Sequence, residues 1–259
     1  MSSVIVAVSE LLSKSISELL RLRKEAHSLV TLDEMRSIWA VCSAFADGID
    51  EIGGNGHTSA LRTSLMAQAK AFLERKHEGN MSGLAAALDS ERWVQCEVST
   101  ERQAALTRLC SGLSVVLSPS KLSKIERGAS TQKQPEVEIE GSRYRVVWSC
   151  LLLMEMVLSN IAAAAHFPNM ASSSVSKISE LLRLFNSRTT QLVLGAGAIH
   201  SHAKLKSINA KHLSLVTQCL GLVLAALPHV RAALMTQLPK KQHALLNGLD
   251  QIRKEYTDH

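Results

Sequence analysis

The segment VVWSCLLLMEMVLSNIAAAAHF, Val146 to Phe167, is a long apolar run that decides how this chain folds. It is about long enough to span a bilayer, so length alone leaves a membrane helix open. The run contains Glu155 and Asn160, and an acidic residue at the centre of a membrane helix costs roughly 2.5–3.5 kcal/mol. These polar residues favour instead a helix that neighbouring helices bury on most sides.

The composition of the whole chain indicates the same class of structure. With 259 residues, the chain is long enough for one large domain or two small ones. It is 46% hydrophobic but only 3% aromatic, and leucine and alanine, both strong helix formers, dominate. We therefore expect an all-α fold of stacked antiparallel helices, in the form of a bundle or rod.

Apolar residues at helical spacing and local capping signals place the helices. Thr31 to Glu34 matches a capping box, Asn209 is a good N-cap, and Pro239 suits the first position of a last helix. A kink is expected at Pro228. The expected helices cover residues 3–30, 32–51, 58–78, 82–91, 100–117, 145–166, 172–194, 209–235 and 239–257.

The polar, basic segment 118–136 is the best candidate for a linker or long loop. It would divide the chain into a helical segment 1–117 and a second helical segment 137–259. Directly after the linker, apolar and polar residues alternate around Gly141 and Ser142, which predicts a small β-hairpin near 137–147.

One heptapeptide, ISELLRL, occurs twice, at 16–22 and at 178–184. The flanking sequences do not match. We interpret the pair as a common amphipathic helix pattern that recurs by chance in a leucine-rich chain, rather than as a structural repeat.

Charge and cysteine content exclude several classes of protein. The net charge is +6, but lysine and arginine are spread along the chain and mixed with acidic residues, whereas nucleic-acid readers concentrate them. The five cysteines lie far apart and never form a CxxC pair, which argues against a disulfide framework or a zinc site. No secretory signal pattern opens the sequence. No nucleic-acid partner is expected.

The stretch QLVLGAGAIH, 191–200, resembles the start of a phosphate-binding loop. A dinucleotide fingerprint would need a third glycine where His200 stands, and a strand where the preceding residues favour a helix. We interpret Gly195 and Gly197 as a helix end near Ala198 or as a site of close helix packing, followed by a loop over 200–206.

Other chemical motifs are also missing. His200, His202 and His212 have neither nearby acidic residues nor nearby cysteines to complete a metal site. No G-x-S-x-G elbow occurs, and single carboxylates are mostly found near a lysine or arginine on helical faces. We predict no catalytic residues, no cofactor and no metal, and hence a protein that is not an enzyme.

The stretches FNSRTTQLVLGAGAIH, 185–200, and LKSINAKHLSLVTQCL, 205–220, resemble the signature region of the vacuolar protein sorting-associated protein 54 family. That family supplies a subunit of the Golgi-associated retrograde protein (GARP) tethering complex. Syndetin, a subunit of a related tether, shares the first motif. The resemblance extends from about residue 10 to the C-terminus through QAKAFLERKHE at 68–78, LDSERWVQCEV at 88–98 and LPKKQHALLNGLDQIRKEYTDH at 238–259.

Two local features depart from the family pattern. Thr190 stands where members usually have cysteine, and the stretch 200–205 holds one extra residue. Members are also several times longer, with coiled-coil material before this region and a further helical domain after it. The resemblance therefore covers only a middle to C-terminal part of a member.

The resemblance implies a non-enzymatic subunit of a vesicle tether for retrograde transport from endosomes to the trans-Golgi network. The implied partners are the other GARP subunits, with SNARE fusion proteins and peripheral contact with Golgi or endosomal membranes from the cytoplasmic side. The candidate partner contacts are the polar and glycine residues of the signature: Asn186, Arg188, Gln191, Gly195, Gly197, Lys206 and Lys211.

Three alternatives remain open. Arg188 and Gln191 could instead have a purely structural role, satisfying exposed carbonyls at a helix–helix turn. The chain could belong to the syndetin-like endosomal recycling tether. It could also be a basic peripheral membrane protein that binds through its net charge and the loop 121–133.

Overall fold

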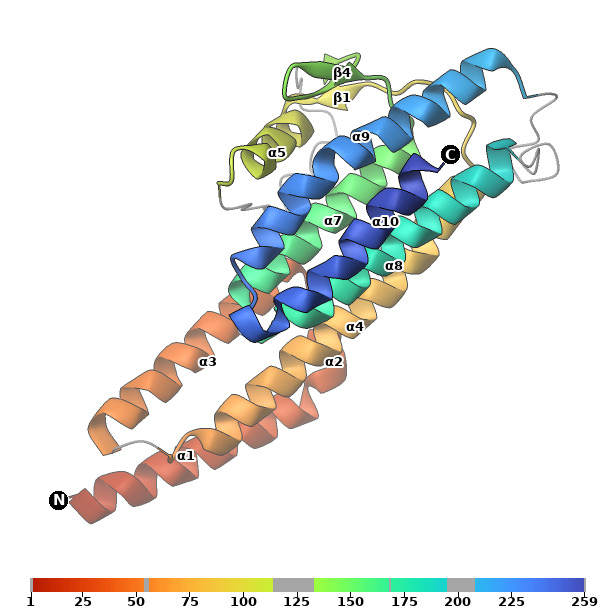
Figure 1. The fold of residues 1–259 in the computed structure, drawn as a ribbon. Helices are drawn as coiled ribbons and strands as arrows, with labels where there is room; N and C mark the ends of the chain where they lie inside the picture. The colour runs from red at the N-terminus through yellow and green to blue at the C-terminus, as the bar shows by residue number, and fades with distance from the viewer. Residues whose placement is uncertain (1, 54–55, 114–132, 168, 195–207, 259) are drawn as a thin grey trace. The chain divides into compact units, whose positions relative to one another are not determined.

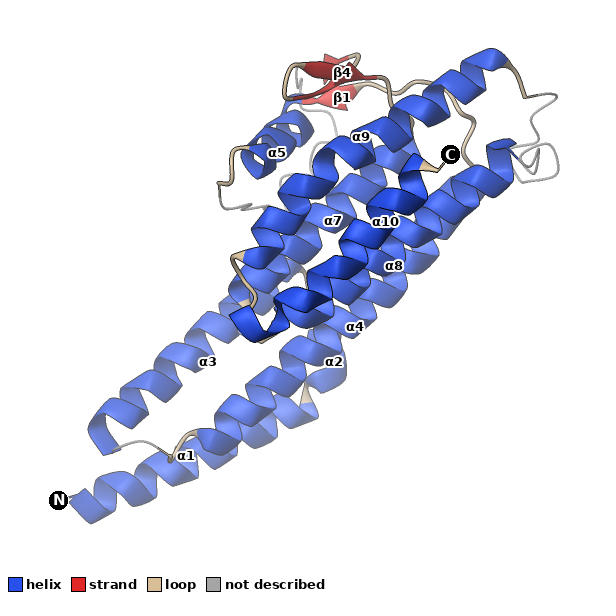
Figure 2. Cartoon of the chain, in the orientation of Figure 1, coloured by secondary structure: helices blue, strands red, loops and turns tan. Residues whose placement is uncertain are grey.

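The computed structural model describes residues 2–53, 56–113, 133–167, 169–194 and 208–258 (Figure 1). The chain divides into two compact units, Met1–Gly79 and Asn80–His259, and the boundary falls inside one long helix, α4, Ser59–Asp89. Helices dominate the described residues, with only short strands (Figure 2). The all-α class expected from composition is confirmed. The expected linker 118–136 lies mostly outside the described residues, and that division of the chain stays a prediction.

The first unit consists of α1, Ser2–Leu22, α2, Lys24–Ser28, α3, Leu32–Gly53, and the first part of α4. Its core is small and comes from three helices that pack side by side. A buried glutamine reinforces it, since Gln68 Nε2 of α4 donates a hydrogen bond of 2.6 Å to the Leu20 carbonyl of α1. The central buried side chains are Leu20, Ala46, Leu61 and Leu65.

Local signals fix the start of α3. The Thr31 N–H donates to Glu34 Oε2 at 2.7 Å, and the Glu34 N–H donates to Thr31 Oγ1 at 3.3 Å, so the predicted capping box is confirmed. These bonds from Thr31 hold the pKa of Glu34 below its usual value. The helix expected over 3–30 is wrong in one respect, because Arg23, with ψ near 9°, separates α1 from α2.

Helix α4 corrects a second expectation. The sequence suggested separate helices over 58–78 and 82–91, but the structure has one continuous helix. Gly79 costs the helix only roughly 1 kcal/mol relative to alanine. No proline interrupts the backbone bonds, and Leu73 and Leu84 on either side of the glycine are both buried. Packing therefore outweighs the local penalty.

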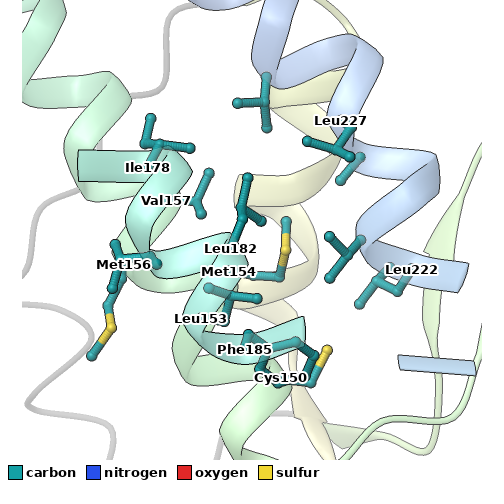
Figure 3. Packing of buried hydrophobic residues seen from close by; sticks show 14 of the residues in the cluster. Cys150, Leu153, Met154, Met156, Val157, Ile178, Leu182, Phe185, Leu222 and Leu227 are labelled. Carbon is teal, nitrogen blue, oxygen red and sulfur yellow. The ribbon is translucent and has the colours of Figure 1, made fainter. Parts of the chain in front are cut away.

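The second unit is a bundle around α7, Trp148–His166, which packs on α8, Ala171–Thr189, and on α9, Ala210–Met235. Figure 3 shows the side chains that meet there, among them Leu153 of α7, Leu182 of α8 and Leu222 of α9. Two further helices complete the bundle. They are α5, Thr100–Cys110, and α10, Asn247–Thr257, which a 3-10 segment, Lys240–Leu246, precedes.

Two predicted helices end or begin differently in this unit. The helix expected to reach residue 117 ends at Cys110, because Gly112 adopts φ of +66° and the Leu113 N–H donates to the Arg108 carbonyl at 3.0 Å. That is a glycine C-cap of the Schellman type. The last helix begins at Asn247 rather than at Pro239, since the residues between them form the tighter 3-10 turn.

Two antiparallel strand pairs accompany the helices. β3, Val137–Ile139, pairs with β4, Ser142–Tyr144, and β1, Val98–Ser99, pairs with β2, Lys133–Gln134. Glu140 and Gly141 connect β3 to β4 with φ of 50° and 80°, as a two-residue hairpin turn requires. The predicted hairpin is confirmed.

Glu155 and Asn160, the two polar residues of α7 that argued against a membrane helix, find partners inside the unit. Glu155 forms an ion pair with Arg102 of α5, and this guanidinium lies 4.8 Å from the centre of the Trp148 ring. Asn160 Nδ2 donates to the Met156 carbonyl at 2.8 Å. Both α7 and α9 are long and apolar enough to cross a membrane. However, 72% of the most apolar 18-residue stretch of α7 and 50% of that of α9 are buried in the structure. The buried-helix interpretation of α7 therefore fits its surroundings.

Asn209 is the N-cap of α9, as predicted, and it forms a capping box with His212. Asn209 Oδ1 accepts from the His212 N–H at 3.2 Å, and His212 Nδ1 accepts from the Asn209 N–H at 3.4 Å. Replacing Asn209 with alanine is expected to lower the free energy of unfolding by about 1 kcal/mol, because a backbone donor loses its partner. Urea denaturation would measure this. Asn209→Ser, which keeps a capping oxygen, should stay near the parent value, and equal losses in both variants would contradict a capping role.

Candidate protein-interaction site

Three of the signature residues lie where α8 changes into a wider helical turn. α8 ends at Thr189, and Thr190–Leu194 form a π-helical turn. Asn186 and Arg188 belong to the last turn of α8, and Gln191 to the π turn, so the structure brings these three together. π-helical turns are rare in proteins, and those that do occur are often found at functional sites.

The other candidate residues are not part of this cluster as described. Gly195, Gly197 and Lys206, with the expected helix end near Ala198, lie outside the described residues. Lys211 is exposed at the second position of α9.

An apolar stripe on α8 anchors the site. Val175, Ile178, Leu182 and Phe185 are all buried, and after the helix changes type Leu192 is buried as well. One face of α8 is therefore committed to the core. Only its remaining polar positions are available for other roles.

Asn186 joins α8 to the C-terminal helix. Its side chain is buried, and Nδ2 donates to the Glu255 carbonyl of α10 at 3.3 Å. Next to it, Tyr256 Oη donates to the Leu182 carbonyl at 2.7 Å, and Arg183 forms an ion pair of 3.6 Å with the Glu255 carboxylate. Asn186 is thus a structural link between two helices.

Arg188 joins α8 to the end of α4. Its Nη2 lies 3.4 Å from Asp89 Oδ2, and its Nη1 donates to Gln191 Oε1 at 3.4 Å. Its described bonds therefore go to side chains, and not to the backbone carbonyls that the structural interpretation suggested. The pair with Asp89 is about one-third exposed on both sides, so it contributes no more than about 1 kcal/mol.

Sequence reasoning missed Asp89, Glu255 and Tyr256. Each belongs to a segment that was quoted for the family resemblance, but none stood out by its residue type. They matter because they are the partners of the signature helix, 69 to 99 positions away along the chain.

The chemistry available here is that of recognition. Gln191 is exposed and Arg188 is partly exposed, so amide and guanidinium groups reach solvent at this helix end. In the described part of the chain, no group of three histidine, cysteine or acidic residues could hold a metal ion. The arrangement supports a surface for a protein partner.

Tyr256 makes this junction sensitive to alkaline pH. Burial raises the pKa of its phenol well above the usual value near 10. Because the folded pKa is raised, the stabilisation is complete below about pH 10 and is lost as the pH rises towards the folded value. We expect the 295 nm absorbance of one tyrosine to appear together with the loss of helical circular dichroism. In Tyr256→Phe this linked change in absorbance and circular dichroism should be missing. If the change persists in that variant, another group causes it.

Comparison with known proteins identifies the family. A family model described as Vps54-like protein matches residues 141–259. The vacuolar protein sorting-associated protein 54 of Homo sapiens is 37% identical over 212 residues, which cover 81% of this chain and 21% of the human protein. The chain belongs to the Vps54 family. The Arabidopsis thaliana relative is 28% identical over an alignment that covers all of this chain and 31% of its own length, and the Drosophila melanogaster relative is 32% identical over 77% of this chain and 20% of its own.

The chain corresponds to only part of a Vps54 protein. The chain spans about a fifth of the length of the human and Drosophila relatives and about a third of the length of the Arabidopsis relative. No solved structure matches it. The Vps54-like match contains α7, α8, α9 and α10, and with them Asn186, Arg188 and Gln191, but not Asp89 of α4.

Proposed function

We propose that this chain acts as a non-enzymatic part of a vesicle tethering complex of the GARP type, in retrograde transport from endosomes to the trans-Golgi network. The observation that carries the proposal is the 37% identity to human Vps54 over 212 residues. A helical scaffold with a polar helix end on its surface suits this role, because such a surface can hold a partner helix without any bond chemistry.

The proposed partners are the other subunits of the tether, with SNARE proteins and peripheral membrane contact as further partners on the cytoplasmic side of Golgi and endosomal membranes. The proposed contact residues are those of the signature. Of these, Arg188 and Gln191 present polar groups at the described surface. Gly195, Gly197, Lys206 and Lys211 complete the candidate set.

Arg188→Ala is expected to reduce recovery of tether subunits several-fold while leaving folding nearly unchanged, because its ion pair is partly exposed. Quantitative pull-down with a tagged chain would measure recovery, and circular dichroism would report folding. A matched control is Arg143→Ala, since Arg143 also forms an exposed ion pair, with Glu138 in the hairpin. Equal recovery by Arg188→Ala and the parent would rule out Arg188 as a partner contact.

The proposed function is tested by co-purification of the tagged chain from its own cells. Recovery of the GARP subunits supports the proposal, whereas recovery of the syndetin-containing tether assigns the chain to endosomal recycling. Flotation with anionic liposomes tests the third candidate. Salt-sensitive binding to vesicles, without any tether subunit, would assign the chain to the membrane-surface class.

A further inference from the structure

Glutamine side chains occupy the outer edge of β3, where a further strand of the sheet could pair. In the hairpin of β3 and β4, Glu138 lies opposite Arg143, one position before the pair that closes the two-residue turn. At such a position the backbone N–H and C=O point away from the partner strand. The Glu138 N–H donates to Gln103 Oε1 of α5 at 2.9 Å, and the Glu138 carbonyl accepts from Gln103 Nε2 at 2.7 Å. One side-chain amide therefore makes both of the bonds that a neighbouring strand would make.

A second glutamine, Gln134 of β2, extends this arrangement. Its Nε2 donates to Gln103 Oε1 at 2.9 Å and to the Glu136 carbonyl at 2.8 Å. The two linked amides thus bond to backbone groups at alternate positions along the edge, those of Glu136 and Glu138. Gln103 Nε2 also donates to Thr107 Oγ1 on its own helix at 3.2 Å. Gln103 therefore keeps a partner when another backbone takes over its bonds to Glu138.

A cleft of about 490 Å³ lies beside this edge, between α5 and β3. This volume is within the range of pockets that hold ligands. The cleft is lined by Thr107, Cys110 and Ser111 at the end of α5 and by Glu138, Ile139 and Glu140 of the hairpin, beside both glutamines. A strand edge that borders such a space can accept an extended peptide, whose main-chain hydrogen bonds give affinity and whose side chains give specificity. The geometry therefore fits strand addition.

The charge of the cleft selects the chemistry of its occupant. Among the described residues that line it, the charged ones are Glu138 and Glu140, and the C-terminal end of α5 adds the negative end of a helix dipole. Glu138 pairs with Arg143 at 3.6 Å. Glu140 pairs with His229 at 3.2 Å. Both carboxylates are more than half exposed and can accept further hydrogen bonds, so the cleft suits lysine or arginine side chains rather than acidic ones.

We propose that the cleft between α5 and β3 binds an extended, basic segment of a partner protein, which adds to the hairpin as a third strand. The backbone of this segment takes over the bonds that Gln103 makes with Glu138, and its lysine or arginine side chains reach Glu138 and Glu140. Gln103 thus competes with the partner for the same backbone groups. The residues involved differ from those of the signature junction, and the proposal does not depend on the proposed tethering role.

The first test uses a labelled synthetic peptide of about eight residues, a typical strand length, in which lysine alternates with valine. Fluorescence anisotropy measures its binding to the whole chain. The same peptide with glutamate in place of lysine should bind at least about tenfold more weakly, because it meets acidic side chains. The lysine peptide with N-methylated backbone amides, which cannot donate to a strand, should also bind at least about tenfold more weakly. No binding of the lysine peptide, or equal binding of either control peptide, overturns the proposal.

The second test changes the chain instead of the peptide. Gln103→Ala removes the competing amide and should tighten binding of the lysine peptide several-fold, whereas damage to the hairpin would weaken it. The matched control is Gln218→Ala, because Gln218 Oε1 accepts from the Arg145 N–H at 2.6 Å, directly after β4. This control should leave the affinity unchanged. Circular dichroism confirms that each variant is folded. Unchanged or weaker binding by folded Gln103→Ala overturns the proposed use of the β3 edge.

The double variant Glu138→Gln/Glu140→Gln tests the charge of the cleft. It keeps the size of both side chains and the backbone edge, and it should weaken binding of the lysine peptide several-fold. It should also reduce the dependence of binding on salt, because fewer exposed charges are then screened. An affinity equal to that of the parent chain overturns the assignment of a basic partner.

Discussion

Leu181→Ala is expected to lower the free energy of unfolding of the Asn80–His259 unit by about 2–5 kcal/mol. Leu181 is fully buried in α8. Truncation removes apolar contacts and leaves a cavity that neighbours on α7 and α10 can fill only partly. Hydrogen exchange resolved by peptide suits this measurement, because it reports the opening of each unit separately.

The matched control is Leu19→Ala, the same position in the other copy of ISELLRL. Leu19 is 56% exposed, so its replacement should change stability by no more than about 0.5 kcal/mol. Local sequence is identical in the two variants, and any difference must come from tertiary packing. Equal losses at both positions would show that Leu19 is covered by other side chains in solution.

Features set by a few neighbouring residues could be predicted from the sequence. The capping box at Thr31, the N-cap at Asn209 and the hairpin near 137–147 were confirmed, because backbone donors, side-chain acceptors and allowed φ values are all local. Helix periodicity also predicted α3, α7 and α9 well. These signals need no knowledge of what the helix packs against.

Tertiary choices could not be predicted in the same way. The arginine of ISELLRL shows why, since Arg21 pairs with Glu18 in its own helix, whereas Arg183 pairs with Glu255 of α10. The continuity of α4 through Gly79 also depends on the burial of the leucine side chains on either side of this glycine. Here the local penalty is small and the decisive contacts lie far away in the sequence.

The same distinction holds for the candidate site, where the sequence indicated some residues but not the residues that they contact. The resemblance named Asn186 and Arg188, and the structure places both at the end of α8. Their partners, Asp89 and Glu255, come from α4 and α10 and have no local signal. A carboxylate on a helix end usually indicates a solvated surface, and only the fold shows which arginine or amide it meets.

Arg102→Ala is expected to lower the free energy of unfolding by about 2–4 kcal/mol, the second large effect. Arg102 and Glu155 are 15% and 23% exposed, so removing the guanidinium leaves a largely desolvated carboxylate on the apolar helix α7. It also removes the contact with the Trp148 ring. Urea denaturation followed by tryptophan fluorescence and circular dichroism together would measure the loss.

The double variant Arg102→Met/Glu155→Leu separates the cost of a broken pair from the value of an intact one. It replaces both charges with apolar side chains of similar size, and such replacements are often neutral or stabilising. We expect it to recover stability to within about 1 kcal/mol of the parent. If the double variant were as unstable as Arg102→Ala, the ion pair would contribute net stability of its own. Recovery would instead mean that Glu155 is tolerated in α7 only because Arg102 is present, and that apolar packing holds this helix in the bundle.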